Sequence, residues 1–255
     1  MMKWLAHGEH EVPDGTDWLS TWEREYAAGI RFRKRYDEFR TRRYTAKRAV
    51  AAVFDVAPSS AGLATIEIRN HPSGAPYLEI EGRLAAADVS LSDRAGWAVC
   101  LVGPVGSIRS GSLGIDLEIV EPRSERFIDD FLTPGEIERV RAHEPGEERD
   151  AAANLVWSAK EAALKVRQVG LRHDTRTVEV QWWDEPAVDG WCRLEVLATD
   201  SRRYRGWWRR DRRFVLTVAA VEDVDPPVLL GGNRGLESAK PTHSWLDKPD
   251  RGSGA

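Results

Sequence analysis

The order of predicted helices and strands constrains this fold most, because a helical region precedes a set of strands twice along the chain. Residues 14–54 place apolar side chains at mixed three- and four-residue spacing, which predicts helix with a break near Gly29. Alternating or continuous apolar segments then predict strands at 64–70, 76–82, 96–103 and 111–120. We therefore expect the first half of the chain to pack helix against sheet.

The second half of the chain repeats this order. Helices are predicted over 124–142 and 149–168, with Thr133 as an N-cap ahead of Pro134. Further strands are predicted at 177–183, 191–198 and 214–222. Because short turns separate the strands, we predict an α+β protein of two similar α/β lobes, with mostly antiparallel sheets and packed helices. The two halves show no repeated sequence.

The composition is typical of a soluble globular protein, since 42% of the 255 residues are hydrophobic and 31% are charged. No stretch approaches about 18 consecutive apolar residues, and the first residues show no secretory signal. Cys100 and Cys192 lie in apolar runs without metal-ligand spacing, which favours buried free thiols in a reducing compartment. We expect a cytoplasmic protein with no membrane partner, and a disordered tail over 226–255, where Gly, Ser, Pro and charge accumulate.

Two carboxylates stand two positions apart in the segment GIDLE, residues 114–118. Side chains alternate along a strand, so Asp116 and Glu118 are expected to share one face, while the neighbouring apolar side chains pack on the other. Gly114 permits the close approach of a backbone or a ligand. Taken alone, this segment also suits an ordinary strand with a solvated polar face.

A third carboxylate lies in WSAKEAALK, residues 157–165, where Glu161 and Lys165 are one helical turn apart. An exposed Glu–Lys pair is common on helix surfaces, so this segment alone is also weak. Together with Asp116 and Glu118, however, Glu161 makes a set of hard oxygen donors of the kind magnesium prefers. The six histidines are scattered and provide no competing cluster for a softer metal.

Two basic segments could bind anions in a chain whose net charge is −4. Residues 31–48 carry nine Lys and Arg against two acids, which suits a nucleic-acid groove, a polyphosphate site or an exposed helix face. Residues 202–213 mix arginines with aromatic rings, as in base-stacking surfaces, although a charged hairpin connection is the simpler interpretation.

A turn region precedes the apolar strand at 96–103. Gly74 and Pro76 indicate one turn, and the segment 89–94 is interpreted as a second turn with Ser92 and Asp93. Hydroxyl groups, backbone N–H groups and an arginine in such a turn can hold a phosphate, although ordinary turn chemistry explains the segment equally well.

These segments and their order resemble the 4′-phosphopantetheinyl transferases, in particular the longer single-chain type whose two similar lobes form a pseudo-dimer. The family signature is G-[IV]-D-x-E and, further along the chain, [FW]-S-x-K-E-[AS]-x-x-K. Residues 114–118 and 157–165 match the two parts, and the gap between them is similar to the gap in the family. The family's GxP element, its serine–histidine turn and its arginine-bearing helix resemble residues 74–76, 89–93 and 42–50. The resemblance covers residues 30–225.

The resemblance implies an enzyme that transfers the phosphopantetheine arm of coenzyme A to a serine hydroxyl of an apo acyl or peptidyl carrier protein. Such enzymes require magnesium and release adenosine 3′,5′-bisphosphate. It implies Asp116, Glu118 and Glu161 as magnesium ligands, and Glu161 and Lys165 as catalytic residues. Glu161 corresponds to the general base, acting directly or through a water, and Lys165 to a phosphate contact. The residues implied in coenzyme A binding are Arg43, Arg48, Gly74, Pro76, Ser92, Asp93, Lys160 and Lys165.

Two positions depart from the family pattern. Ala75 stands where the family often has lysine, and Asp93 where it usually has histidine after the second serine. Both changes remove a cationic or donor contact to phosphate, and an acid at 93 repels phosphate unless it faces away or pairs with Arg94. We interpret them as a variant grip on coenzyme A, with other arginines compensating.

The resemblance also implies a division of the chain. Residues 1–110 form an N-terminal lobe that grips the nucleotide, and residues 111–225 form a lobe that carries the metal and catalytic motifs. We expect a monomer, since both lobes lie in one chain, and a role in secondary-metabolite biosynthesis. Two alternatives stay open: a degenerate homologue that binds carrier protein or coenzyme A without turnover, and a nucleic-acid-binding protein that uses residues 31–48 and 202–213.

Overall fold

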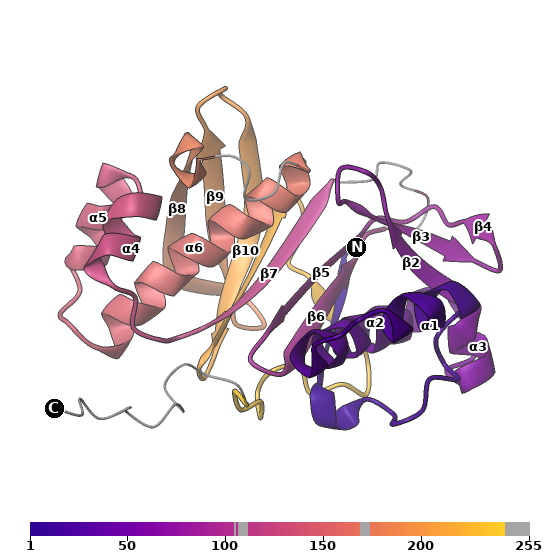
Figure 1. The fold of residues 1–255 in the computed structure, drawn as a ribbon. Coiled ribbons are helices and arrows are strands. Elements are labelled where there is room, and N and C mark those ends of the chain that lie inside the picture. The colour runs from indigo at the N-terminus through magenta and orange to yellow at the C-terminus, as the bar shows by residue number, and fades with distance from the viewer. Residues whose placement is uncertain (105, 107–111, 169–173, 243–255) are drawn as a thin grey trace, which may run out of the picture.

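The structure is a computed structural model and describes residues 1–104, 106, 112–168 and 174–242 (Figure 1). The α-helices are α1 (Thr21–Ala28), α2 (Arg33–Phe54), α3 (Ser60–Ala64), α4 (Glu125–Phe131), α5 (Pro134–Arg141) and α6 (Glu147–Arg167). The strands are β1 (Lys3–Gly8), β2 (Ile66–Asn70), β3 (Pro76–Ile80), β4 (Arg83–Leu84), β5 (Val89–Arg94), β6 (Trp97–Val102), β7 (Leu113–Ile119), β8 (Val178–Val188), β9 (Trp191–Ala198), β10 (Arg203–Asp211), β11 (Phe214–Ala220) and β12 (Val228–Leu229).

The strands form three sheets. The first has the order β12-β1-β6-β5, the second has the order β7-β11-β10-β9-β8, and a small third sheet has the order β2-β3-β4. All the pairings are antiparallel except that of β1 with β12. β5 and β7 lie side by side between the two halves of the chain (Figure 1). The predicted mixture of helices and mostly antiparallel sheets is confirmed.

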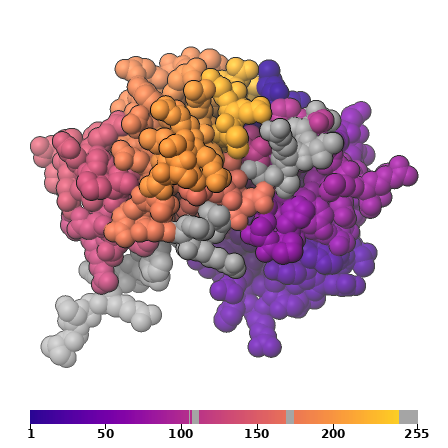
Figure 2. All heavy atoms as spheres, turned by 90° about the horizontal axis from the view of Figure 1, so that it is seen from above, coloured from indigo at the N-terminus to yellow at the C-terminus, as the bar shows by residue number. Residues whose placement is uncertain are grey.

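Each long helix covers one face of one large sheet. α2 packs on β1 and β6, and α6 packs on β7 and β11. Besides the contacts under each helix, one apolar cluster contains Trp4 and Leu101 from the first sheet together with Ile115 and Leu216 from the second. The two sheets therefore share a core, and Figure 2 shows the two halves packed against each other, in indigo and purple and in pink and orange.

The two long helices are anchored in the same way. Ser20 and Thr133 cap the short helices α1 and α5, each with a capping-box glutamate at the third position, Glu23 or Glu136. Each glutamate also pairs with a lysine of the long helix that is 0% exposed. Glu23 Oε2 lies 2.5 Å from Lys47 Nζ on α2, and Glu136 Oε2 lies 2.8 Å from its lysine on α6, Lys160. The second cap, acid and lysine each follow the first by 113 residues.

Most predicted elements are confirmed to within a few residues, and the helical break near Gly29 separates α1 from α2. Two segments predicted as a turn or a connection are strands. The segment 89–94 is strand β5 rather than a turn, because Val89 packs into the core while Ser90 and Ser92 are satisfied by neighbouring β7. The segment 202–213 contains strand β10 rather than only a hairpin connection.

The segment after residue 226 differs from the disordered tail expected from composition, over the part the structure describes. β12 pairs in parallel with β1, and the yellow segment lies against the indigo N-terminus in Figure 2. Leu236 is 0% exposed and joins the core shared by the sheets. The Trp97 indole N–H donates to the carbonyl of Lys240 at 2.9 Å. The few apolar residues in this segment were enough to order it. Residues 243–255, and the expected lobe boundary at 110 and 111, lie outside the described residues.

The structure shows the state of both cysteines and the length and apolar character of the helices. Cys100 and Cys192 are both buried and free, as predicted. Within the described part of the chain, no helix is both long and apolar enough to span a bilayer.

A buried histidine predicts acid sensitivity. His7 on β1 is 7% exposed and packs 5.1 Å, ring to ring, from Tyr44. Burial is the main cause that lowers its pKa from 6.5 to about 4; Arg48 lowers it further, and Glu11 opposes the shift. The unfolded chain thus takes up this proton first, so the stabilising contribution is present above pH 6.5 and is lost as the pH falls to 4.

We expect His7 to cost about 3 kcal/mol of unfolding free energy between pH 7 and pH 4. Urea unfolding at several pH values checks this, with the variant His7→Phe as reference. The variant should lose less stability on acidification than the wild type. An equal loss in both proteins would show that His7 does not carry the effect.

Candidate functional site

The acids of β7 face helix α6. Ile115, Leu117 and Ile119 point into the core shared by the sheets, so Asp116 and Glu118 point to the opposite face, as predicted. α6 crosses this face closely at Gly114, where a Cβ atom would collide with the carbonyl oxygen of Ala162. The close crossing brings Glu161 and Lys165 of α6 to the acids of β7.

Asp116 is the centre of the group. It is 6% exposed, and its Oδ1 accepts hydrogen bonds from Ser92 Oγ and from Lys165 Nζ, both at 2.9 Å. Lys165 Nζ also donates to the carbonyl of Ile115 at 2.7 Å and to that of Leu91 at 3.3 Å. The second oxygen of Asp116, Oδ2, is buried and has no hydrogen-bond partner among the described residues.

Glu161 has a similar orphaned oxygen. Its Oε1 is buried and accepts no hydrogen bond from any described residue. Burial is the largest cause that raises the pKa of Glu161 to about 7; the charges of Asp116 and Glu118 raise it as well, and Lys165 lowers it. Negative charge is therefore crowded around Glu161, and Lys165 partly offsets it.

Glu118 is surrounded differently. Its Oε1 accepts a hydrogen bond from the Trp157 indole at 3.1 Å, and its Oε2 lies 3.1 Å from Arg123 Nη2 and 3.1 Å from Arg94 Nε. Burial, followed by the charge of Asp116, raises the pKa of Glu118 to about 7, although the two arginines oppose the rise.

The fit of a divalent cation can be judged from these oxygens. No three His, Cys, Asp or Glu side chains of the described ranges come together in a ready-made metal cluster. The orphaned Asp116 Oδ2 and Glu161 Oε1 are nevertheless the hard donors that magnesium takes, and magnesium commonly uses one or two carboxylates, with waters and phosphate oxygens completing its shell. Asp116 and Glu161 each offer such an ion an oxygen without a partner among the described residues, whereas both oxygens of Glu118 already have partners.

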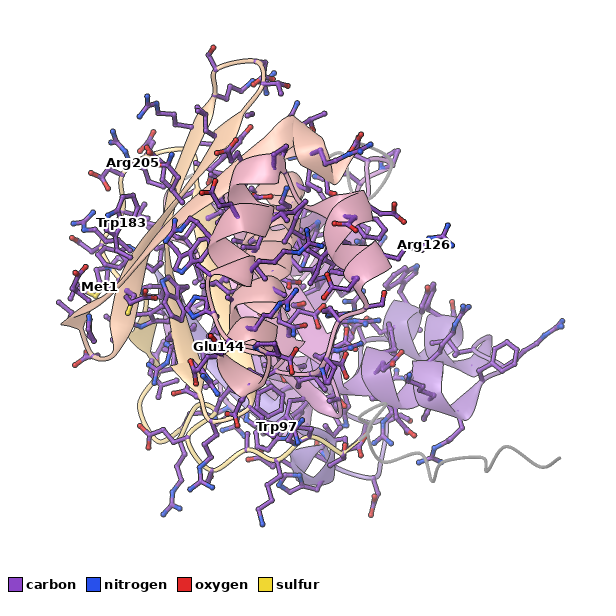
Figure 3. All side chains as sticks on the ribbon, turned by 90° about the vertical axis from the view of Figure 1, so that its left-hand side faces the viewer. Met1, Trp97, Arg126, Glu144, Trp183 and Arg205 are labelled. Atoms are coloured by element: carbon purple, nitrogen blue, oxygen red, sulfur yellow. The ribbon has the colours of Figure 1, made fainter. Side chains whose placement is uncertain are left out.

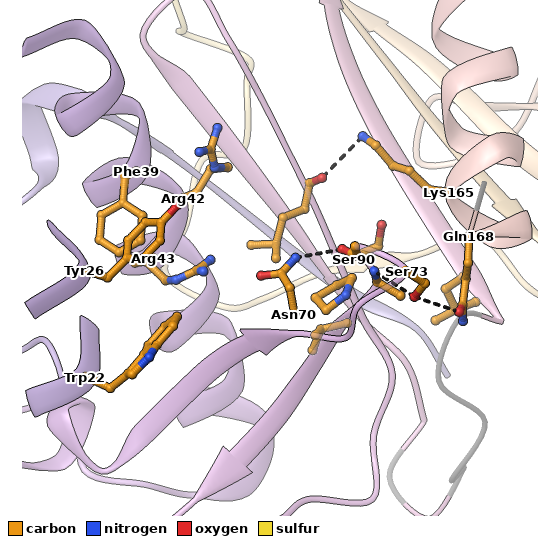
Figure 4. Close-up of a pocket in the computed structure, with 16 residues that line it drawn as sticks. Trp22, Tyr26, Phe39, Arg42, Arg43, Asn70, Ser73, Ser90, Lys165 and Gln168 are labelled. Carbon is orange, nitrogen blue, oxygen red and sulfur yellow. Dashed lines mark hydrogen bonds between the residues drawn. The ribbon is translucent and has the colours of Figure 1, made fainter. Parts of the chain in front are cut away.

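A pocket of about 600 Å³ opens beside this group. Lys165 and Gln168 line one side, and the aromatic rings of Trp22, Tyr26 and Phe39 line the other (Figure 4). The remaining lining residues are Arg42, Arg43, Asn70, Ser73, Gly74, Ala75, Pro76, Val89, Ser90, Leu91 and Leu113. Its size suits a cofactor-sized ligand, and its walls combine aromatic and cationic groups.

The structure brings several of the expected coenzyme-binding residues to this pocket. Arg43, Gly74, Pro76 and Lys165 line it, whereas Ser92 does not line it and donates to Asp116. Arg43 is itself largely buried, with its guanidinium 5.0 Å from the Phe39 ring centre.

Three other expected residues are engaged elsewhere. Asp93 forms an ion pair with Arg42 rather than with Arg94. Arg48 donates to the Tyr44 hydroxyl at 3.2 Å and does not line the pocket. Lys160 is fully buried and donates to two backbone carbonyls, those of Thr175 and Val178, in addition to its pair with Glu136.

Sequence reasoning missed the aromatic wall and Arg42. Trp22 and Tyr26 stack with ring centres 5.5 Å apart on successive turns of α1, and Tyr26 is 55% exposed. An aromatic pair at four-residue spacing was a usable signal. Arg42 was visible only as one of several arginines in the segment 31–48, because nothing in the sequence tells which of them faces a pocket.

The basic segments are largely neutralised within the protein. On β10, Arg203 and Arg205 approach Glu195, and Arg209 pairs with Asp211. Arg205 and Trp183 project from the outer side of the second sheet in Figure 3. In the segment 31–48, the ion pairs are Arg33–Asp37, Lys34–Glu38, Arg42–Asp93, Arg43–Glu23 and Lys47–Glu23. These contacts do not favour a nucleic-acid-binding surface.

The family comparison places this site in a known context. Residues 112–218 match the family model of the 4′-phosphopantetheinyl transferase superfamily. The match runs from β7 into β11 and includes Asp116, Glu118, Glu161 and Lys165, whereas the wall formed by α1 and α2 lies outside it. It supports a phosphopantetheinyl transferase activity in general. No curated protein matches the chain.

Proposed function

We propose that the protein transfers the 4′-phosphopantetheine arm of coenzyme A to a serine hydroxyl of an apo acyl or peptidyl carrier protein. One observation carries the proposal: two orphaned carboxylate oxygens and a lysine amine meet beside a cofactor-sized pocket, within the residues that match the transferase family. Members of this family use coenzyme A and Mg²⁺, and both fit this arrangement.

Asp116 and Glu161 would hold the magnesium ion. When bound, the ion would neutralise the charge of the pyrophosphate and of the leaving group. Lys165 has its amine on Asp116 Oδ1 and lines the pocket. Its three N–H groups already serve Asp116 and two carbonyls, so it would give up its long contact to the Leu91 carbonyl, at 3.3 Å, to meet a phosphate oxygen while it still orients the carboxylate. The Ser92 hydroxyl holds the same oxygen of Asp116 from the β5 side.

The transfer forms a bond between the carrier serine oxygen and the β-phosphorus of coenzyme A. The bond from that phosphorus to the bridging oxygen of the pyrophosphate breaks, and adenosine 3′,5′-bisphosphate leaves. The serine must lose its proton as it attacks. Of the two site carboxylates that keep an oxygen without a partner among the described residues, Glu161 is the partly exposed one, so it takes the proton, directly or through a water.

We propose the following position for the two ends of coenzyme A in the pocket. The pyrophosphate lies toward Lys165, and the nucleotide end lies toward Arg42, Arg43 and the aromatic wall of Trp22 and Tyr26. Guanidinium groups suit the 3′-phosphate, and an exposed aromatic face can stack on the adenine ring. In this proposal the residues that grip the nucleotide lie mainly in the first half of the chain.

We also propose that the chain has two similar lobes, as in the longer type of this family. The repeated capping boxes and buried Glu–Lys pairs support this, with a constant offset of 113 residues. Trp18 and Tyr44 pack ring to ring at 5.4 Å, and Phe131 and Trp157 pack at 5.3 Å with the same offset.

A direct test follows the small product. The protein is incubated with coenzyme A, Mg²⁺ and an apo carrier protein, and adenosine 3′,5′-bisphosphate is measured by chromatography. We expect its release to depend on the carrier and to stop when EDTA removes the metal. Coenzyme A binding without release, across fatty-acid, polyketide and peptide carriers, would instead favour the degenerate homologue.

The Asp93–Arg42 pair predicts a gain in coenzyme A affinity. Both side chains are partly exposed, so their interaction is worth at most about 1 kcal/mol. Asp93→Asn should free Arg42 for phosphate and remove a repelling charge, lowering the Kd for coenzyme A by about two- to fivefold. Calorimetry measures this Kd. The control is Asp37→Asn, which removes an acid from α2, the helix that carries Arg42. An unchanged or higher Kd for Asp93→Asn would show that Arg42 does not reach the ligand.

A further inference from the structure

Glu118 is the acid of the site whose oxygens are both already used. The Trp157 indole donates to Oε1, and Arg123 and Arg94 hold Oε2, each within 3.1 Å. Asp116 and Glu161 each keep one buried oxygen without a partner among the described residues. Glu118 therefore differs from the other two acids, although the sequence presents the three as one set.

The arginines that hold Glu118 are themselves fixed. Arg123 Nε donates at 2.7 Å to Asn154, which is 0% exposed, and its guanidinium lies 4.7 Å from the Phe127 ring centre. Arg94 and Arg123 also share Glu121, which is 4% exposed. A cation on Oε2 of Glu118 would have to displace two anchored positive charges, and a cation on Oε1 would compete with the Trp157 indole and stand close to the same two arginines, which is unfavourable on Coulombic grounds.

Glu118 also connects to an aromatic group beside the site. Trp157 packs edge to face on Phe127 at 5.1 Å and on Phe131 at 5.3 Å. Through Arg123 and Trp157, Glu118 joins β7 to helix α4, which carries both phenylalanines.

We propose that Glu118 is not a ligand of the metal but a positioning residue, which fixes Arg123, Trp157 and the α4 segment beside a cation site made by Asp116 and Glu161. This inference rests on the proposed function for the identity of the cation. Two protein carboxylates suffice for magnesium when waters and substrate phosphates fill the remaining positions.

Mn²⁺ binding, measured by electron paramagnetic resonance with and without coenzyme A, tests the assignment without any turnover. The variants are Asp116→Asn, Glu118→Gln and Glu121→Gln. The last is the matched control, because it removes the same charge from the same two arginines at a position that the proposal also leaves off the metal.

We expect Asp116→Asn to weaken Mn²⁺ binding by more than about tenfold. Glu118→Gln and Glu121→Gln should weaken it equally and by no more than about threefold, well under the 1.4 kcal/mol of a tenfold change. If Glu118→Gln weakened Mn²⁺ binding as much as Asp116→Asn and more than Glu121→Gln, the inference about Glu118 would be overturned and the proposed function would be unaffected. No Mn²⁺ binding by the wild type, even with coenzyme A, would remove the Asp116–Glu161 site and the magnesium part of the proposed function as well.

A second measurement needs no variant of Glu118 that might unfold. The indole N–H resonance of Trp157 is assigned in a ¹⁵N spectrum by its loss in Trp157→Phe. If Glu118 keeps its hydrogen bond to Trp157, this resonance stays in place when Mg²⁺ and coenzyme A are added. A shift toward the position of a free indole would show that Glu118 moves to the metal and would contradict the proposal.

Discussion

Glu161→Gln is expected to lower the transfer rate by about 10²–10⁴-fold, the usual contribution of a positioned general base. Glutamine keeps the size of the side chain but neither takes the serine proton nor binds a cation with a charged oxygen. The variant should stay folded, because Glu161 Oε1 makes no hydrogen bond that could be lost and its negative charge is repelled by Asp116 and Glu118. Its thermal midpoint should equal or exceed that of the wild type.

The rate is measured from the release of adenosine 3′,5′-bisphosphate at saturating coenzyme A, and the thermal midpoint from circular dichroism. Glu144→Gln is the control, since Glu144 is an exposed residue of the segment between α5 and α6, ahead of the first turn of α6 (Figure 3). A Glu161→Gln variant that transfers within about threefold of the wild-type rate would contradict a role for Glu161 as base, which is worth at least about 10²-fold.

Lys160→Met is expected to lower the free energy of unfolding by about 3–5 kcal/mol, the cost of breaking a buried ion pair by removing one partner. The lysine and Glu136 are almost completely buried, and the change would leave the carboxylate charge of Glu136 without its cation. Burial raises the pKa of Glu136 and lowers that of Lys160, so the pair is stable only as a pair.

The double variant Lys160→Met, Glu136→Gln should recover part of that loss, because no uncompensated charge remains. Recovery stays incomplete, since glutamine can accept only one of the two backbone N–H bonds, from Thr133 and Val180, that Glu136 accepts. Lys47→Met provides a matched comparison in the first half of the chain and should cost a similar amount, since Lys47 is held by Glu23 and three carbonyls. Urea unfolding measures all three. If Lys160→Met instead kept its stability and lost coenzyme A affinity, Lys160 would be a coenzyme contact, as the family resemblance implied.

The periodicity of the sequence predicted the helices and strands of this chain well, but it did not predict which of them pack together. The shared face of Asp116 and Glu118 follows from strand alternation alone, and the i,i+4 spacing of Glu161 and Lys165 follows from the helix. That α6 crosses β7 at Gly114 follows from tertiary packing, to which Gly114 was only a hint.

The failures have physical reasons. The segment 89–94 has the polar composition of a turn, but β6 and β7 satisfy its hydroxyl and backbone groups, so it is a strand. Lys160 stands in a catalytic motif, yet its amine pairs with Glu136 of the α5 capping box and with two backbone carbonyls. Which arginine faces a pocket and which forms a surface pair depends on acids distant in sequence, such as Asp93 for Arg42.

The central claim is that this protein attaches phosphopantetheine to a carrier serine, and intact-mass spectrometry of the carrier tests it most directly. An apo carrier is incubated with the protein, coenzyme A and Mg²⁺, beside a reaction with Asp116→Asn and a carrier whose target serine is alanine. The account predicts a mass gain of one phosphopantetheine on the intact carrier in the wild-type reaction and in neither control. No gain on carriers of any type, from a folded protein supplied with coenzyme A and Mg²⁺, would contradict it.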